Sequence, residues 1–253
     1  MTNHIEDIAT QNRRSSDMTL RKAAQVAGIM FLLSLMIPLL NWIFVHSKFI
    51  VAENAADTAH NILANEFLFR IGIINDLITS AVALVLALAL YIILKSINKN
   101  LASLALFLKL TEAILLAVIA LGSFIALLML NGRASVTVFE PEQLQALVGL
   151  FLNARISLSA IPMVFLGLNL MVFLYLLFKS KYVPGILSGF GILSYALIFI
   201  YALITVISPH YAAIMTIQII CWVPSCFFEL IVGFWLLIKG VNCPEMSGDK
   251  NEF

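Results

Sequence analysis

Long apolar stretches alternate with shorter polar connections along most of the chain. An α-helix needs about 20 apolar residues to cross the hydrocarbon core of a bilayer, and each stretch reaches that length. The six stretches lie at about 23–45, 68–94, 101–130, 156–178, 185–207 and 212–238. The pattern predicts an all-α polytopic membrane protein with one domain of six transmembrane helices, residues 23–240. Residues 1–22 are predicted to form a disordered tail, and residues 241–253 a second tail.

The connections differ in length and in pattern. Those at 95–100 and 179–184 are short and basic, which predicts two helical hairpins. Those at 46–67 and 131–155 are longer, and the second has Pro141 ahead of apolar residues at helical spacing. These residues are Leu144, Leu147, Val148 and Phe151. Such patterns predict amphipathic interfacial helices in the two longer loops, more weakly in the first.

Lysine and arginine are concentrated on one side of this topology. The two tails and the two short turns together carry ten of them, against four on the other side, leaving out Lys109 within a span. The positive-inside rule then places both termini in the cytoplasm. The sequence contains no Asn-x-Ser/Thr sequon, which fits a bacterial protein with its six spans in the cytoplasmic (inner) membrane.

Composition narrows the class of protein further. With 62% hydrophobic residues, 11% charged residues and a mean hydropathy of +1.02, the chain is unlike a soluble domain. The net charge of +1 gives no basic surface for nucleic acid. The cysteines and histidines show neither a zinc spacing nor a catalytic motif, so neither a metal site nor a cofactor is predicted.

Ionisable groups within the spans are the candidate functional residues. Lys109 and Glu112 lie three residues apart in the apolar stretch 101–130, hence on one helical face where they can pair. A charge in hydrocarbon is costly unless it finds a partner, water or a proton. Helical rise from the flanking loops places three more polar groups at the same depth, roughly 15 Å from the cytoplasmic interface. The predicted intramembrane polar site is Lys109, Glu112, Asn169, Tyr195 and Glu229.

The same helical spacing predicts two secondary candidates for the polar site and three charged residues near the outer membrane surface. Gln218 and Ser225 share a polar stripe with Glu229, and polar stripes on membrane helices face inward. Arg70, Asp76 and Arg155 fall at the outer edge of the hydrocarbon, where we expect them to be hydrated.

Two structural readings stay open for the polar site. Lys109 and Glu112 could form an ordinary interfacial ion pair if the long span projects beyond the bilayer. Glu229 could be a hydrogen-bonded or protonated carboxyl group that only supports helix packing.

Several stretches, taken in order, resemble the bacterial multi-pass membrane family known as domain of unknown function 4386. They are Leu88–Leu104 (LALYIILKSINKNLASL), Pro141–Phe151 (PEQLQALVGLF), Val164–Lys181 (VFLGLNLMVFLYLLFKSK) and the ending from Phe228 through Trp235 and Lys239 to Val241. The resemblance implies a prokaryotic protein with six spans. It implies no activity, so no catalytic residue is assigned.

Three functions are compatible with these features. The favoured one is a binding or transport protein for a small molecule, an ion or a proton, with a polar cavity in the inner half of the membrane. The first alternative is a non-catalytic accessory or regulatory membrane component. The second is a membrane-embedded enzyme acting on a lipid or isoprenoid, with the two glutamates as acid and base, but no enzyme is favoured. The expected partners are the lipid bilayer and a small-molecule or lipid ligand, without nucleic acid, and a homo-oligomer has no support in the sequence.

Overall fold

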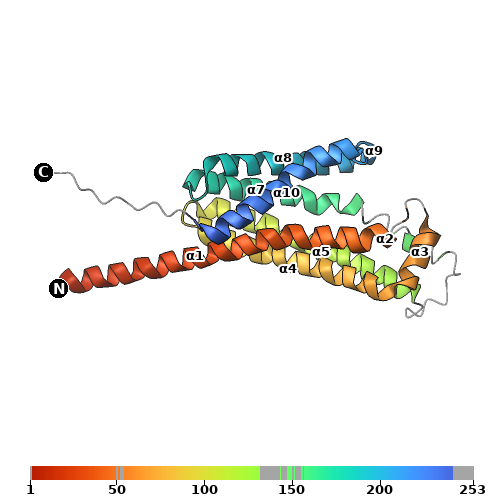
Figure 1. Cartoon of the computed structure of the whole chain (residues 1–253), viewed down its shortest axis with the longest axis horizontal. Helices are drawn as coiled ribbons and strands as arrows, with labels where there is room; N and C mark the ends of the chain where they lie inside the picture. The colour runs from red at the N-terminus through yellow and green to blue at the C-terminus, as the bar shows by residue number, and fades with distance from the viewer. Residues whose placement is uncertain are drawn as a thin grey trace.

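The chain is a bundle of long helices (Figure 1). The computed structural model describes residues 2–49, 51, 54–131, 143, 147–149, 151, 155 and 157–241. These residues contain no β-strand, and six of the helices they form are long and apolar enough to cross a membrane. The predicted all-α polytopic membrane fold is therefore confirmed.

The described elements follow one another along the chain. They are α1 (Thr2–Asn41), the π-helix η1 (Trp42–His46), α2 (Ser47–Phe49), α3 (Ala55–Ala64), α4 (Glu66–Leu94), α5 (Lys99–Leu130), α7 (Ala160–Ser180), α8 (Gly185–Ile207), α9 (Pro209–Ala212) and α10 (Met215–Ile238). The hairpin turns after α4 and α7 lie where the sequence predicts them.

The first helix is longer than expected. Residues 2–22, predicted as a disordered tail, are the beginning of α1. Residues 2–27 contain neither glycine nor proline, and adding residues to an existing helix is easier than starting a new one. The apolar span that follows therefore continues back into a polar helix.

The two longer connections contain helical residues. In the first, α3 buries Ala59 and Ile62 while Asp57 and His60 are exposed, which is the amphipathic pattern expected there. Much of the second, predicted at 131–155, lies outside the described residues. Those described between 143 and 155 are helical, and Val148 is fully buried.

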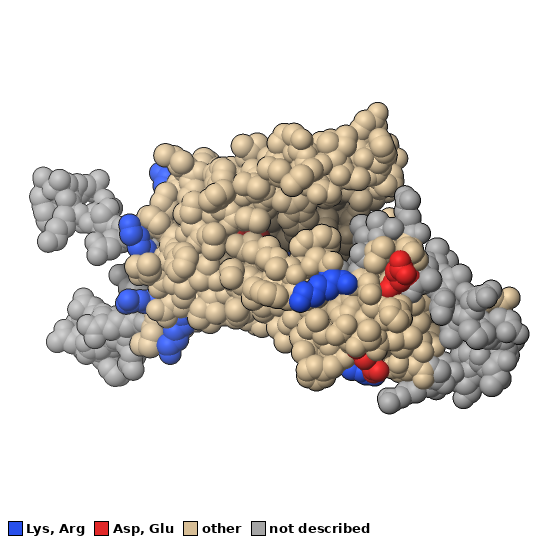
Figure 2. Space-filling model, turned by 45° about the vertical axis from the view of Figure 1, so that its right-hand side comes forward, with Lys and Arg blue, Asp and Glu red and all other residues tan. Residues whose placement is uncertain are grey.

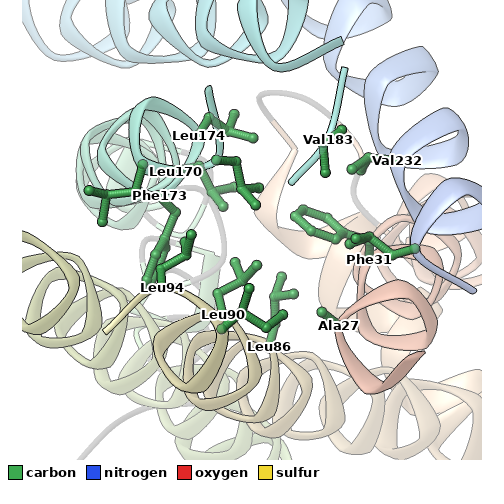
Figure 3. Packing of buried hydrophobic residues seen from close by; sticks show 14 of the residues in the cluster. Ala27, Phe31, Leu86, Leu90, Leu94, Leu170, Phe173, Leu174, Val183 and Val232 are labelled. Atoms are coloured by element: carbon green, nitrogen blue, oxygen red, sulfur yellow. The ribbon is translucent and has the colours of Figure 1, made fainter. Parts of the chain in front are cut away.

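The six spanning helices form a closed ring. Each contacts the next along the chain, in the order α1, α4, α5, α7, α8 and α10, and α10 contacts α1 again. The centre is filled by apolar side chains from opposite sides of this ring, as Figure 3 shows for Phe31, Leu90 and Leu170. A second apolar cluster around Phe49 and Ile62 lies near α3. The bundle therefore has a packed core on which polar side chains can be fixed.

Basic side chains gather at one end of the bundle. Figure 2 shows Lys and Arg there, and Figure 1 places the start of α1 and the end of α10 at that end. We call it the lysine-rich end, after the exposed Lys22, Lys95, Lys99, Lys179 and Lys239. Large apolar side chains are exposed along all six helices, as contact with lipid requires. The opposite end carries α3 and α9.

Candidate functional site

Lys109 and Glu112 form a buried ion pair on α5. The Lys109 Nζ lies 2.9 Å from Glu112 Oε1, and the two residues are 3% and 4% exposed. A pair on a projecting helix end would be exposed, so the interfacial reading is wrong. The pair is an internal feature of the bundle.

Asn169 extends this pair to α7. Its Nδ2 donates to Glu112 Oε2 at 2.7 Å and also to the backbone oxygen of Phe165. The side chain is fully buried, and its Oδ1 accepts no hydrogen bond from the part of the chain that the structure describes. Glu112 thus has a partner on each oxygen, while Asn169 keeps a free acceptor inside the bundle.

Glu229 on α10 is held by hydroxyl groups. The Tyr195 hydroxyl on α8 donates to Glu229 Oε1, and Ser34 Oγ on α1 lies 3.2 Å from Glu229 Oε2. Tyr195 is buried, whereas Ser34 and Glu229 are partly exposed. Tyr195 and Phe31 each stack edge to face on Phe228, which fixes the tyrosine ring.

The two groups belong to one polar layer. Asn169 on α7 and Tyr195 on α8 lie where these two helices pack closely, because a Cβ added at Gly167 would lie 3.0 Å from the backbone oxygen of Tyr195. We define the polar layer as Ser34, Lys109, Glu112, Asn169, Tyr195 and Glu229. It joins five of the six spanning helices, and it contains all five residues of the predicted intramembrane site.

Charge does not balance within the polar layer. Lys109 is bound to Glu112, and Glu229 forms no ion pair with any residue that the structure describes. With both glutamates ionised, the layer carries one excess negative charge. An isolated carboxylate in a low-dielectric environment is strongly disfavoured, so Glu229 needs a bound proton or a cation.

Ser34 can accommodate either state of Glu229. Its Oγ lies 2.8 Å from the backbone oxygen of Phe31 as well as 3.2 Å from Glu229 Oε2. A serine hydroxyl has one proton and can donate to one of them at a time. An ionised Glu229 accepts that proton, whereas a protonated Glu229 can donate to Ser34 while Ser34 donates to Phe31. Turning one O–H bond switches between these arrangements.

Ser34 is the member that the predicted site lacks. A single serine in an apolar span gives little signal, because its hydroxyl usually bonds to its own helix backbone. Its distance along α1 from Lys22 places it at the depth of Glu229, which is the signal that could have found it.

The two secondary candidates are bound elsewhere. Gln218 Nε2 donates to the backbone oxygen of Ala212 at 3.0 Å, near the start of α10. Ser225 is buried, and its hydroxyl donates to the backbone oxygen of Trp222 at 2.8 Å. Both lie on α10 with Glu229, but their hydrogen bonds go to nearby backbone oxygens, so neither joins the polar layer.

Two of the predicted outer charges form a pair. Arg155 Nη2 lies 2.6 Å from Asp76 Oδ2, with side chains only 16% and 17% exposed. Arg155 Nη1 also donates to Ser123 at 2.6 Å, and Asn41 Nδ2 to Asp76 at 2.9 Å. Asp76 and Arg155 are therefore largely covered by protein, contrary to the prediction that they are hydrated.

Arg70 behaves differently from that pair. It binds Glu66, one turn earlier on α4, and both side chains are about one-third exposed (33% and 35%). This is an ordinary exposed helical ion pair. Within the described residues, no group of three His, Cys, Asp or Glu side chains is placed to hold a metal ion.

A family model described as a domain of unknown function, DUF4386, matches residues 26–240. No curated protein and no solved structure matches the chain.

Proposed function

The chain belongs to the DUF4386 family, and we propose that it is a membrane binding or transport protein in which Glu229 takes up and releases a proton or another small cation. One observation carries the proposal. The polar layer holds two glutamates and one lysine, and that lysine is bound to Glu112. A proton or cation from outside the chain would neutralise Glu229.

Exposure of the carboxyl group supports exchange with the surroundings. Glu112 is 4% exposed, whereas Glu229 is partly exposed. Figure 2 shows a hollow in the middle of one face, with acidic atoms at its floor. A carboxyl group that binds and releases a small cation needs such access, and a sealed one does not.

The helices that carry Ser34 and Glu229 are tightly joined on one side of this contact. A Cβ added at Gly28 of α1 would lie 2.7 Å from the backbone oxygen of Gly233 on α10. Both glycines lie between the Ser34–Glu229 contact and the lysine-rich end. Here the two backbones touch, so α1 and α10 are fixed to each other.

The same two helices are weakened on the other side of the contact. Pro38 in α1 and Pro224 in α10 both lie toward the opposite end of the bundle. Proline removes a backbone hydrogen bond and permits a kink, and α1 then passes into the π-helix η1. Bending at these points, with the glycine contact as pivot, would alter access to Glu229.

Proton flux into lipid vesicles tests the proposal. The purified protein is reconstituted into vesicles that enclose a pH-sensitive dye, and a pH step is applied outside. We expect faster dye response than in protein-free vesicles, and loss of that response in Glu229→Gln. Glu66→Gln, which alters an exposed carboxyl group on α4, is the control and should behave as wild type. A response that survives Glu229→Gln would overturn the proposal.

The alternative is a non-catalytic accessory or regulatory component. It is favoured by the tight packing of Lys109, Glu112, Asn169 and Tyr195, which are all buried and hydrogen-bonded. A layer that only specifies helix packing would conduct no protons, and Glu229→Gln would leave every phenotype unchanged. Vesicles containing wild-type protein that respond no faster than protein-free vesicles would favour this alternative.

We also propose a location and an orientation. The excess of Lys and Arg at the lysine-rich end supports a bacterial cytoplasmic membrane with that end inside. Single cysteines introduced at Lys99 and His210 provide the test, in a variant without native cysteines. An impermeant thiol reagent added to intact cells should label the cysteine at position 210 and not the one at 99.

A further inference from the structure

An apolar groove lies on the outer surface of the bundle between α1 and α4. Its lining alternates small residues and larger apolar ones along both helices. The lining residues are Thr19, Lys22, Ala23, Val26, Val85, Leu88, Ala89 and Ile92. Ala23 and Ala89 are 8% and 4% exposed and form the floor, while Leu88 is 53% exposed and forms a wall. The groove thus follows the two helices on a surface that faces lipid.

The lysine-rich end of this groove carries positive charge from both helices. Lys22 belongs to the lining itself. Lys95 follows the last residue of α4, and its backbone has right-handed helical φ and ψ angles. It lies three residues after Ile92, which places it at the end of the groove on the same side of α4 as Ile92. Among the side chains that the structure describes, none of those lining the groove is acidic. The site therefore combines a hydrocarbon-lined channel with two ammonium groups at one end.

From this arrangement we infer that the groove between α1 and α4 binds an anionic phospholipid. One acyl chain lies along Ala23, Val26 and Leu88, and the phosphate lies between Lys22 and Lys95. Each lysine near an anionic headgroup contributes about 1 kcal/mol, which corresponds to about fivefold in affinity. This inference does not depend on the proposed role of Glu229.

A second surface groove shows why the first is preferred. It is lined by four residues of α10, Ile231, Phe234, Trp235 and Ile238, and by Lys239, which directly follows that helix. The Lys239 Nζ there lies 4.2 Å from the centre of the Trp235 ring, a cation–π contact. That groove offers one lysine, already in contact with an aromatic ring, instead of two lysines from different helices.

Native mass spectrometry of the full-length protein in detergent tests the inference. The protein is titrated with phosphatidylglycerol and, separately, with phosphatidylcholine of the same acyl chains. We expect tighter binding of phosphatidylglycerol, reduced about fivefold in Lys22→Ala or Lys95→Ala and about 25-fold in the double variant, at ~1 kcal/mol for each lysine. The control is Lys179→Ala with Lys181→Ala, which removes two lysines from the other basic turn and should keep wild-type binding.

A third variant tests the acyl channel separately from the charges. Val85→Trp places a bulky ring in a wall position that is 42% exposed, so it should weaken binding while both lysines remain. Circular dichroism and thermal unfolding verify that each variant is folded. Equal binding of the two lipids would overturn the inference, as would selectivity that survives loss of both Lys22 and Lys95. Loss of selectivity only in the Lys179 and Lys181 control variant would place the site elsewhere and overturn it as well.

Discussion

Glu112 and Glu229 are two carboxyl groups in one polar layer, yet their surroundings differ. Glu112 is buried, and it binds the Lys109 ammonium with one oxygen and the Asn169 amide with the other. Glu229 is partly exposed and is bound only by the hydroxyls of Tyr195 and Ser34. At equal depth, Glu112 has a cationic partner and Glu229 has none among the described residues. On our proposal, this difference leaves Glu229 able to exchange a proton.

The ion pair of Asp76 and Arg155, at the opposite end of the bundle, contrasts with Glu229 in the same way as Glu112 does. Asp76 binds Arg155 at 2.6 Å and also accepts from Asn41. This cluster connects α1, α4 and α5 to the segment before α7, as a structural ion pair would. Among Glu66, Asp76, Glu112 and Glu229, only Glu229 lacks a cationic partner within the described residues.

The largest expected effect comes from neutralising the paired glutamate. Glu112→Gln leaves the Lys109 ammonium buried without its anion, and breaking a buried pair from one side costs roughly 3–5 kcal/mol. Glu229→Gln leaves no orphaned charge, and its amide can still bond to Tyr195 and Ser34, so we expect about 1 kcal/mol or less. Chemical unfolding in detergent, followed by circular dichroism, measures both losses.

The order of these two losses is the informative result. If Glu229→Gln destabilises the protein as much as Glu112→Gln does, the two carboxyl groups have the same structural role. Glu112 as a structural carboxyl group and Glu229 as an exchangeable one could then no longer be distinguished. A double variant, Lys109→Met with Glu112→Met, should recover much of the stability lost in Glu112→Gln, because it removes both charges together.

A smaller effect is expected where α1 meets α10. Gly28→Ala places a methyl group 2.7 Å from the backbone oxygen of Gly233 and 2.9 Å from the backbone nitrogen of Leu237, so the helices must separate. Overpacking of this kind costs roughly 1–3 kcal/mol. Gly189→Ala on α8 is the matched control, because no atom lies within 4 Å of its added Cβ.

Thermal unfolding of the two glycine variants tests whether α1 and α10 are tightly packed at Gly28. We expect a clear decrease in melting temperature for Gly28→Ala and little change for Gly189→Ala. Proton flux should also change in Gly28→Ala if the glycine contact is the pivot for access to Glu229. Equal melting temperatures for the two variants would mean that α1 and α10 are not tightly fixed at this point.

Sequence reasoning located the polar layer because depth follows from counting residues along each helix. These residues lie on four helices, and basic residues mark one end of each; they are Lys109, Glu112, Asn169, Tyr195 and Glu229. Helical rise is nearly constant, so the height of each residue could be predicted without knowing how the helices pack. The number of spans followed from length and hydropathy in the same way.

Counting residues along each helix does not predict which side chains of different helices contact each other. Asp76 and Arg155 are 79 positions apart, and nothing in their local sequence indicates that they meet. Ser34 was missed for the same reason, since its role depends on α1 lying beside α10. Polar composition predicts disorder at the start of the chain, but residues 2–22 are helical, and none of them is a glycine or proline that would end a helix.

The most direct test of the central claim is an infrared difference spectrum of the purified protein between acidic and alkaline pH. A protonated carboxyl group has its own C=O stretching band, distinct from that of a carboxylate. In the wild-type protein we expect one such band that disappears as the pH rises, because Glu229 loses its proton. In Glu229→Gln this band should be missing at every pH. An unchanged titrating band in Glu229→Gln, or no titrating band within the membrane core of the wild type, would contradict the claim that Glu229 holds an exchangeable proton.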